Sequence, residues 1–312
     1  MGRWTAAGYA CDTASGGARW GAAAYDDVMT DASERGFAIR GVRIPAILYG
    51  TAWKEDATES LVFGALTAGF RGIDTANQRK HYHEAGVGRG IARAVAAGIP
   101  RDALFVQTKF THLGGQDQRL PYDAAAPVAE QVAQSFASSL AHLGVSHLDS
   151  LVLHGPSLRD RLAPADREAW RAIEAIAAAG GASLIGISNV TAGQIRELIE
   201  LARIPPAFVQ NRCYAERGWD RAIRALCAEH GILYQAFSLL TANRDVVAGR
   251  TVRAIAARHG RTAAQIVLRF ARQVGMLPLT GTTSPQHMRD DLADDFALSV
   301  DEVAAIDAAG QT

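Results

Sequence analysis

The sequence of 312 residues predicts a closed (β/α)8 barrel. Short apolar runs alternate with longer segments of helical spacing from Ile44 onward, and the alternation repeats eight times without a break in composition. Continuous apolar runs are typical of parallel strands that are buried on both faces. Parallel strands joined by helices form either a closed barrel or an open, doubly wound sheet. Eight units in about 250 residues match the size of the barrel.

Each predicted strand is an apolar run that ends in a polar or small residue. The strands, in order, are Ala46–Tyr49, Gly69–Ile73, Leu104–Thr108, Leu148–Leu153, Leu184–Ile187, Phe208–Gln210, Ile232–Ala236 and Met276–Thr280. The expected helices are Ala57–Ala68, Ala85–Ala97, Pro127–Leu143, Pro164–Ala179, Ala192–Ala202, Trp219–His230, Ala263–Val274, Pro285–Leu292 and Val300–Ala309. Many of them are rich in alanine, which favours the helical conformation.

Local signals support the ends of several helices. Gly69 and Gly144 lie where helices are expected to stop, because glycine adopts the left-handed conformation that ends a helix. Thr191 followed by Gln194 resembles a capping box at a helix start. The glycine-rich run at Gly86–Gly90 follows a loop rather than a strand and lacks the GxGxxG spacing of a dinucleotide-binding turn. We therefore expect that run to lie within a helix.

Two connections are longer than the rest, Phe110–Ala126 and Gly155–Pro164. Both follow predicted strands, so in a barrel both lie at the C-terminal mouth, where barrel enzymes carry their active sites. Residues 1–36 are rich in Gly, Ala and Ser and lack clear periodicity, apart from a short helix expected near residues 22–33. We interpret residues 1–36 as an N-terminal extension of unknown role and residues 37–312 as a single barrel domain.

Composition narrows the class of protein. Hydrophobic residues make up 48% of the chain and charged residues 21%, which is ordinary for a soluble globular protein. The 32 Lys and Arg residues balance the 32 Asp and Glu residues, so no net charge attracts nucleic acid or an acidic membrane. Cys11, Cys213 and Cys227 are scattered, without disulfide or zinc-type spacing. We expect a cytoplasmic protein, a monomer or weak homo-oligomer, that does not bind nucleic acid or membrane.

Four residues with reactive side chains fall at or just beyond the ends of successive strands: Asp74, Tyr82, Lys109 and His154. A barrel brings consecutive strand ends together, so we expect these groups to converge. Together they suit the donation of a proton to a carbonyl oxygen. The tyrosine would donate, the lysine cation would lower its pKa, the carboxylate would hold the lysine, and the histidine would orient the carbonyl.

The segments around these residues resemble the aldo-keto reductase family. GFRGIDTA (Gly69–Ala76) is similar to the segment of the catalytic Asp, LFVQTKF (Leu104–Phe110) to that of the catalytic Lys, and LDSLVLHGP (Leu148–Pro156) to that of the catalytic His. The resemblance covers about residues 40–308 and keeps the family's order. It implies a TIM barrel, NADPH as cofactor, and hydride transfer to an aldehyde or ketone.

Further segments resemble the family's cofactor site. LIGISNV is similar to the segment that holds the nicotinamide carboxamide, FVQNRCY supplies a matching Gln, and YQAFSLL contains an aromatic that would stack on the nicotinamide ring. A plain core role for this aromatic, Phe237, is the alternative. The cofactor-binding residues that the resemblance implies are Gly50, Thr51, Ala52, Asp74, Ser188, Asn189, Gln210, Phe237, Ser238, Leu239, Leu240, Gly281, Thr282, Thr283, His287 and Asp291.

The position of the proton donor departs from the family pattern. Arg79 stands where the family's spacing from the Asp would place the tyrosine, and His81 where its spacing from Glu84 would. Tyr82 is the nearby tyrosine, consistent with a loop longer by two residues, and we assign it as the donor. His81 is the alternative. The His81–His83 run lacks partner ligands of suitable spacing, so we predict no metal site.

The substrate pocket and the cofactor's phosphate site also depart from the pattern. We predict substrate contacts from Trp53, Tyr82 and His154, with Gly155 leaving room where many relatives carry an aromatic. Gly281 and His287 stand where relatives carry a Lys and an Arg for the 2′-phosphate. We expect NADPH to be the cofactor, with NADH possible.

The leading hypothesis is therefore an NADP(H)-dependent oxidoreductase that reduces an aldehyde or ketone to an alcohol, or runs the reverse reaction. An alternative is a regulatory or redox-sensing barrel that binds the cofactor with little turnover. A third is a barrel lyase or isomerase without redox chemistry, which would be active without cofactor.

Overall fold

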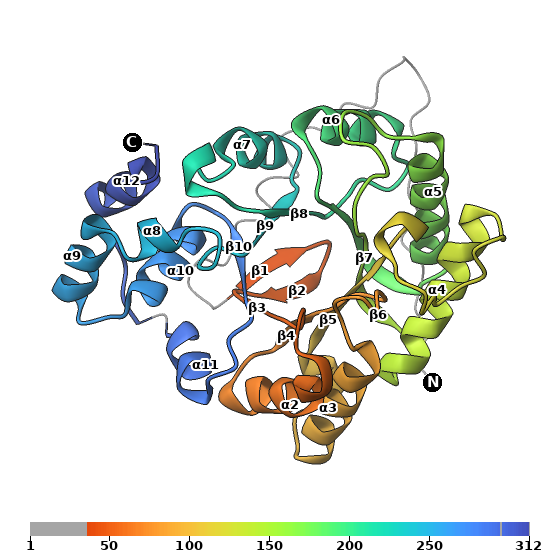
Figure 1. Ribbon diagram of the computed structural model, residues 1–312, viewed down its shortest axis with the longest axis horizontal. Helices are drawn as coiled ribbons and strands as arrows, with labels where there is room; N and C mark the ends of the chain where they lie inside the picture. The colour runs from red at the N-terminus through yellow and green to blue at the C-terminus, as the bar shows by residue number, and fades with distance from the viewer. Residues whose placement is uncertain (1–35, 294, 312) are drawn as a thin grey trace.

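A computed structural model of the chain describes residues 36–293 and 295–311. The described chain forms an eight-stranded closed barrel surrounded by helices (Figure 1), which confirms the predicted fold. The expected extension up to residue 35, its short helix and Cys11 lie outside the described residues. None of the described helices is both long and apolar enough to cross a membrane.

The barrel strands are parallel and pair in a ring. Their bounds are β3 (Leu48–Gly50), β4 (Gly72–Asp74), β5 (Phe105–Phe110), β6 (Leu148–Leu153), β7 (Ala182–Ser188), β8 (Phe208–Arg212), β9 (Leu233–Phe237) and β10 (Leu277–Thr280). β10 pairs with both β9 and β3, and this double pairing closes the ring. Each strand overlaps one of the apolar runs predicted from the sequence, because strands buried on both faces need apolar residues throughout.

Helices follow the strands around the outside (Figure 1). Their bounds are α2 (Thr58–Ala68), α3 (Glu84–Ala96), α4 (Val128–Leu143), α5 (Pro164–Ala178), α6 (Ala192–Leu201), α7 (Arg221–Glu229), α8 (Arg244–Val247), α9 (Arg250–His259), α10 (Ala263–Gln273), α11 (Pro285–Asp291) and α12 (Val300–Ala308). The capping box at Thr191 is confirmed, since its hydroxyl accepts from the Gln194 amide. Gly144 ends α4 in the left-handed conformation, as expected.

The structure differs from the sequence prediction in three main places. Residues 244–259 contain α8 and α9, neither of which was predicted, and α7 begins at Arg221 rather than Trp219. The backbone at Trp219 and Asp220 has φ values of 55° and 52°, which a right-handed helix cannot contain. The third difference is a hairpin of β1 (Gly36–Ile39) and β2 (Val42–Pro45), which starts one residue before the expected domain boundary.

The hairpin covers one end of the barrel. Ile39 and Ile44 pack in one apolar cluster with residues at the beginnings of the barrel strands, among them Leu48, Phe105 and Phe208. Figure 1 shows the hairpin across the centre of the ring of strands. Because these contacts lie at the N-terminal ends of the strands, the hairpin closes that end, and the C-terminal ends form the open mouth.

Candidate active site

A cavity of about 1140 Å³ opens at the C-terminal ends of the strands. It exceeds the roughly 300–1,000 Å³ of most small-molecule sites. Both long connections reach it: Thr111, His112, Gly114 and Gly115 line it from one, and Gly155 from the other. The predicted mouth of the barrel is therefore the site of the large pocket.

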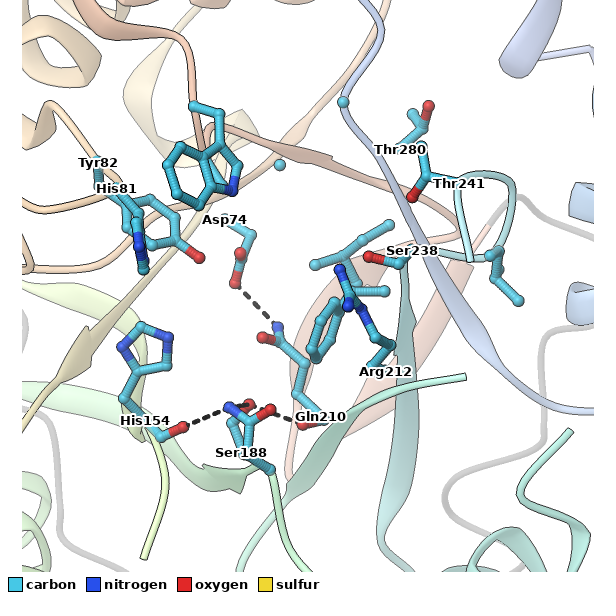
Figure 2. A pocket seen from close by; sticks show the side chains of 18 of the residues that line it. Asp74, His81, Tyr82, His154, Ser188, Gln210, Arg212, Ser238, Thr241 and Thr280 are labelled. Carbon is cyan, nitrogen blue, oxygen red and sulfur yellow. Dashed lines mark hydrogen bonds between the residues drawn. The ribbon is translucent and has the colours of Figure 1, made fainter. Parts of the chain in front are cut away.

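The predicted acid–base residues converge at this cavity. Lys109 Nζ lies 2.7 Å from both carboxylate oxygens of Asp74 and 2.8 Å from the carbonyl oxygen of Thr75. The same Nζ lies 5.4 Å from the centre of the Tyr82 ring. The Tyr82 and His154 rings are 5.9 Å apart and meet edge to face. Figure 2 shows the Tyr82 hydroxyl directed toward the space between Asp74 and His154.

Burial sets the protonation states of these groups. It raises the pKa of Tyr82, and the negative charge of Asp74 raises it further. The expectation that Lys109 lowers the pKa of Tyr82 is therefore wrong in this structure. The carboxylate that Lys109 contacts through both oxygens offsets the effect of its positive charge on the phenol. Tyr82 is a neutral phenol that holds its proton at physiological pH.

His154 is held in a neutral form. Burial, and secondarily the charge of Lys109, lowers its pKa from 6.5 to about 3. Its Nδ1 lies 2.6 Å from the Thr111 hydroxyl, and its backbone carbonyl accepts from Asn189 Nδ2 at 2.8 Å. A hydroxyl that donates to Nδ1 leaves the proton on Nε2. In that tautomer His154 can donate a hydrogen bond to a carbonyl oxygen.

The predicted amide-binding residues adjoin Asp74 and His154. Gln210 Nε2 donates to Asp74 Oδ1 at 3.0 Å, and Ser188 Oγ donates to the backbone carbonyl oxygen of Gln210 at 2.7 Å. Asn189 Nδ2 donates to the carbonyl of His154 and, at 3.1 Å, to Ser188 Oγ. The side-chain nitrogens of Gln210 and Asn189 are thus directed at protein groups, and their carbonyl oxygens are available to accept hydrogen bonds.

Two cations lie along the rest of the cavity. Lys54 donates to the carbonyl oxygen of Gly281, and burial lowers its pKa. The Arg212 guanidinium lies 5.9 Å from the centre of the Phe237 ring. Figure 2 places Arg212 beside Ser238 on the side of the pocket away from His154. These groups give the cavity positive charge suited to an anionic ligand.

Several cavity residues have strained backbones. Trp53, Asn189 and Ser238 have φ values of 62°, 55° and 58°. Residues other than glycine rarely adopt this conformation, and such strain gathers at functional sites. Trp53 is 70% exposed at the mouth, and the centres of its ring and the His81 ring lie 4.1 Å apart, with the two planes tilted by 40°. These two rings form an aromatic surface, the Trp53–His81 surface, next to Tyr82.

Most of the predicted site residues line the cavity. Of the catalytic and substrate set, Trp53, Asp74, Tyr82 and His154 line it, whereas Lys109 is buried behind Asp74. The predicted cofactor residues that line it are Gly50, Ala52, Asp74, Ser188, Asn189, Gln210, Phe237, Ser238, Leu239, Leu240, Gly281, Thr282, His287 and Asp291. Two others do not. Thr51 is buried and bonds to the carbonyl oxygen of Asp74, and Thr283 is exposed outside the lining.

Sequence reasoning missed several lining residues, including Lys54, Gln78, Thr111 and Arg212. Two of them could have been found from strand alternation. Thr111 follows Lys109 by two residues and Arg212 follows Gln210 by two, so each shares a face with a predicted site residue. Within residues 36–293 and 295–311, no cluster of three or more His, Cys, Asp or Glu side chains is arranged for a metal ion.

The fold and the pocket at the strand ends define a barrel enzyme. Sequence comparison gives the family. The chain belongs to the aldo/keto reductase family, whose model matches residues 47–311, and is therefore an oxidoreductase of that family.

Individual relatives support this family assignment. The chain is 31% identical over 268 residues to an aldo-keto reductase of Mycolicibacterium vanbaalenii, with 85% of this chain and 88% of the relative covered. It is 31% identical over 285 residues to morphine 6-dehydrogenase of Pseudomonas putida, with 86% and 88% covered. The structure is similar to that of a Bombyx mori aldo-keto reductase in complex with NADP, with a TM-score of 0.72, 27% identity, and 86% and 89% covered.

Proposed function

We propose that this protein is a carbonyl reductase that uses NADP(H), with Tyr82 as the general acid and base. The observation that carries the proposal is the buried Lys109–Asp74 ion pair next to Tyr82, with neutral His154 on the other side of the phenol. In the reducing direction Tyr82 gives its hydroxyl proton to the carbonyl oxygen of the substrate. In the reverse direction the phenolate that remains takes the proton back from the alcohol.

The residues present fit a nicotinamide cofactor. The carbonyl oxygens of Gln210 and Asn189 can accept from a carboxamide amino group, because the amide nitrogens of both side chains donate to the protein. Phe237 offers an aromatic face beside them, and Lys54 and Arg212 suit a pyrophosphate. When bound, the cofactor supplies the hydride. The chain's own residues orient the carbonyl and move the proton.

The Trp53–His81 surface and Gly155 support a pocket for a carbonyl substrate with an apolar body. Gly155 packs against Asn189, and the absence of a side chain there leaves space beside His154. His154 would orient the carbonyl through Nε2. Tyr82 is preferred over His81 as the proton donor because Tyr82 lies next to Lys109 and His154, whereas the His81 ring contacts the Trp53 ring.

NADPH is the cofactor we propose, with NADH as the alternative. The Bombyx mori relative binds NADP, which favours NADPH. Near Gly281 the cavity is lined by His287 and the carboxyl groups of Asp290 and Asp291, and burial raises the pKa of Asp291. Lys54, which donates to the Gly281 carbonyl oxygen, is the cation at this end, and the two carboxyl groups offset its charge, so both cofactors belong in the assay.

Replacing Tyr82 and His81 one at a time shows which of the two side chains is the proton donor. A panel of aldehydes and ketones is followed by the absorbance of NADPH and of NADH, and cofactor affinity by fluorescence. Tyr82→Phe should lower kcat by roughly 10²–10⁴-fold with little change in cofactor Kd, since only the hydroxyl that donates the proton is removed. His81→Gln should retain most of the turnover.

The opposite pattern, with activity lost in His81→Gln and kept in Tyr82→Phe, would overturn the assignment of Tyr82. Cofactor binding without turnover on any carbonyl would instead favour a regulatory or sensing barrel.

A further inference from the structure

Three buried glutamines meet inside the barrel below the cavity. They are Gln107 on β5, Gln210 on β8 and Gln235 on β9. β5 and β9 are four strands apart in the ring of eight, so Gln107 and Gln235 meet across the barrel. Both are 0% exposed, and neither lines the cavity. The proposed mechanism leaves these two residues without a role.

Asp74 fixes the orientation of two of the three amides. An ionised carboxylate only accepts hydrogen bonds, so any amide that contacts it must present its NH2 group. Gln107 Nε2 lies 2.7 Å and Gln210 Nε2 3.0 Å from Asp74 Oδ1. Both glutamines therefore direct their nitrogens toward Asp74.

Gln235 completes the pattern. Its Oε1 accepts from Gln107 Nε2 at 2.8 Å and from Gln210 Nε2 at 2.8 Å. Its own Nε2 donates to Gln107 Oε1 at 3.0 Å, and that oxygen also accepts from Ser150 Oγ at 2.9 Å. Every contact joins a donor to an acceptor, and rotation of any one amide by a half turn would place like groups together.

The Gln210 amide is the member of this network that faces the cavity. Its nitrogen has partners in Asp74 and Gln235, so its Oε1 is the atom left to meet a ligand. An oxygen held this way accepts from an amino group and is mismatched to a methyl ketone or a carboxylate.

We propose that Gln107 and Gln235 are positioning residues that lock Gln210 with its oxygen toward the cavity and so select a ligand with a carboxamide NH2. The proposal rests on the proposed use of a nicotinamide cofactor. Gln235 acts through Gln210, and Gln107 acts through both Gln235 and Asp74. Loss of Gln235 leaves the Gln210 amide held by Asp74 alone, so its orientation is fixed less firmly and its preference for a ligand with an NH2 donor weakens.

The test compares cofactors that differ in one group. The Kd of NADPH and of its 3-acetylpyridine analogue, in which CH3 replaces the amide NH2, is measured by quenching of protein fluorescence. The wild-type protein should bind NADPH more tightly. Gln235→Met, which keeps a side chain of similar shape, should reduce the ratio of the two Kd values by roughly 2- to 10-fold, the value of one hydrogen bond.

Two further variants serve as controls. Gln131→Met replaces another buried glutamine, one whose amide donates only to backbone carbonyls near α4, and should leave the ratio unchanged. Gln235→Glu should retain the ratio, because a buried neutral acid beside Asp74 can accept from Gln210 and donate to Gln107. Thermal melts confirm that each variant is folded, and Gln107→Met replaces Gln235→Met if the latter is not.

The outcomes separate this inference from the proposed function. Equal wild-type affinity for the amide and the acetyl cofactor would overturn the inference while leaving the reductase intact, and this arm needs no variant. A folded Gln235→Met variant whose ratio of the two Kd values equals that of the wild-type protein would also overturn the inference. Absence of binding by NADPH and NADH alike would overturn the proposed function itself.

Discussion

At the scale of single residues, the site depends on charges that have been removed from water together. The Lys109 and Asp74 side chains are 0% and 4% exposed, and burial lowers the pKa of Lys109 while Asp74 opposes that shift. Removing one partner of such a pair leaves an unpaired buried charge, which is far costlier than losing a surface pair. The pair is therefore a structural requirement of the barrel as well as a neighbour of Tyr82.

The neutral state of His154 gives a pH prediction. Its pKa falls to about 3 in the fold, whereas an exposed histidine titrates near 6.5. Its C2 proton should therefore show no titration by NMR between pH 5 and 8, with His154→Asn identifying the signal.

The same shift affects stability. Below pH 6.5 the unfolded chain takes up a proton on His154 that the native protein does not. The contribution of His154 to the free energy of unfolding is therefore complete above that pH and declines as the pH falls toward 3. His154→Asn should weaken this dependence in urea unfolding at pH 4.5 and 7.5. A wild-type C2 signal that titrates near pH 6.5 would contradict the neutral, buried imidazole.

At the scale of elements, the Gly86–Gly90 run shows how composition sets packing. It lies in α3, as expected, and not in a phosphate-binding turn. A Cβ at Gly88 would lie 2.0 Å from the carbonyl oxygen of His142 in α4, so only glycine permits this approach of the two helices. The glycines of α3 therefore set the distance between neighbouring helices of the outer layer.

A pair of substitutions tests this reading. Gly88→Ala should lower the free energy of unfolding by roughly 1–3 kcal/mol or more, because the backbone of α4 must move. Gly193→Ala in α6 is the matched control: its Cβ would meet nothing closer than the Thr191 hydroxyl at 3.8 Å. That change should stabilise by up to about 1 kcal/mol, since alanine favours helix. Equal effects in urea unfolding would show that α3 and α4 do not pack this closely.

At the scale of the whole molecule, the interior of the barrel is divided. An apolar cluster closed by the hairpin fills the N-terminal end, the glutamines and Asp74 lie further along, and the cavity lies at the C-terminal end. Stability and chemistry are thus placed at opposite ends, as in other barrels of this class.

This division can be tested from the closed end. Ile44→Ala removes a 1% exposed side chain from the apolar cluster and should cost about 2–5 kcal/mol of stability. The cofactor Kd of the folded variant should stay near the wild-type value, because Ile44 lies at the end opposite the cavity. Urea unfolding and fluorescence titration measure the two effects, and a folded variant with weakened cofactor binding would contradict the division.

Much of the fold could be predicted because each parallel strand is visible in the sequence as an apolar run between helices. The hairpin could not, since β1 and β2 are four residues each and face the barrel on only part of their length. α8 was missed because it is only four residues long, and α9 because RTVRAIAARH contains three arginines and few large apolar residues. Short or polar elements acquire their structure from tertiary contacts, which local pattern does not contain.

The candidate site was predictable to the extent that its residues follow strands in a recognisable order. Asp74, Tyr82, Lys109 and His154 converge as expected. The direction of the Tyr82 pKa shift was not predictable, because it depends on how deeply the phenol is buried and on which charge offsets that of Lys109. The amide network was not predictable either, since glutamines within apolar runs carry no signal of where their hydrogen bonds go.

The hairpin at the base of the barrel has a consequence for the order of events. Because the hairpin closes that end, we expect both the dinucleotide and the substrate to enter and leave the cavity through the mouth at the C-terminal ends of the strands. Gln210, proposed to bind the nicotinamide, bonds to the buried side chains of Asp74 and Gln235, whereas Trp53 is 70% exposed at the mouth. We therefore expect the dinucleotide to arrive before the carbonyl compound and the alcohol to depart first, so excess alcohol product should trap the oxidised dinucleotide inside.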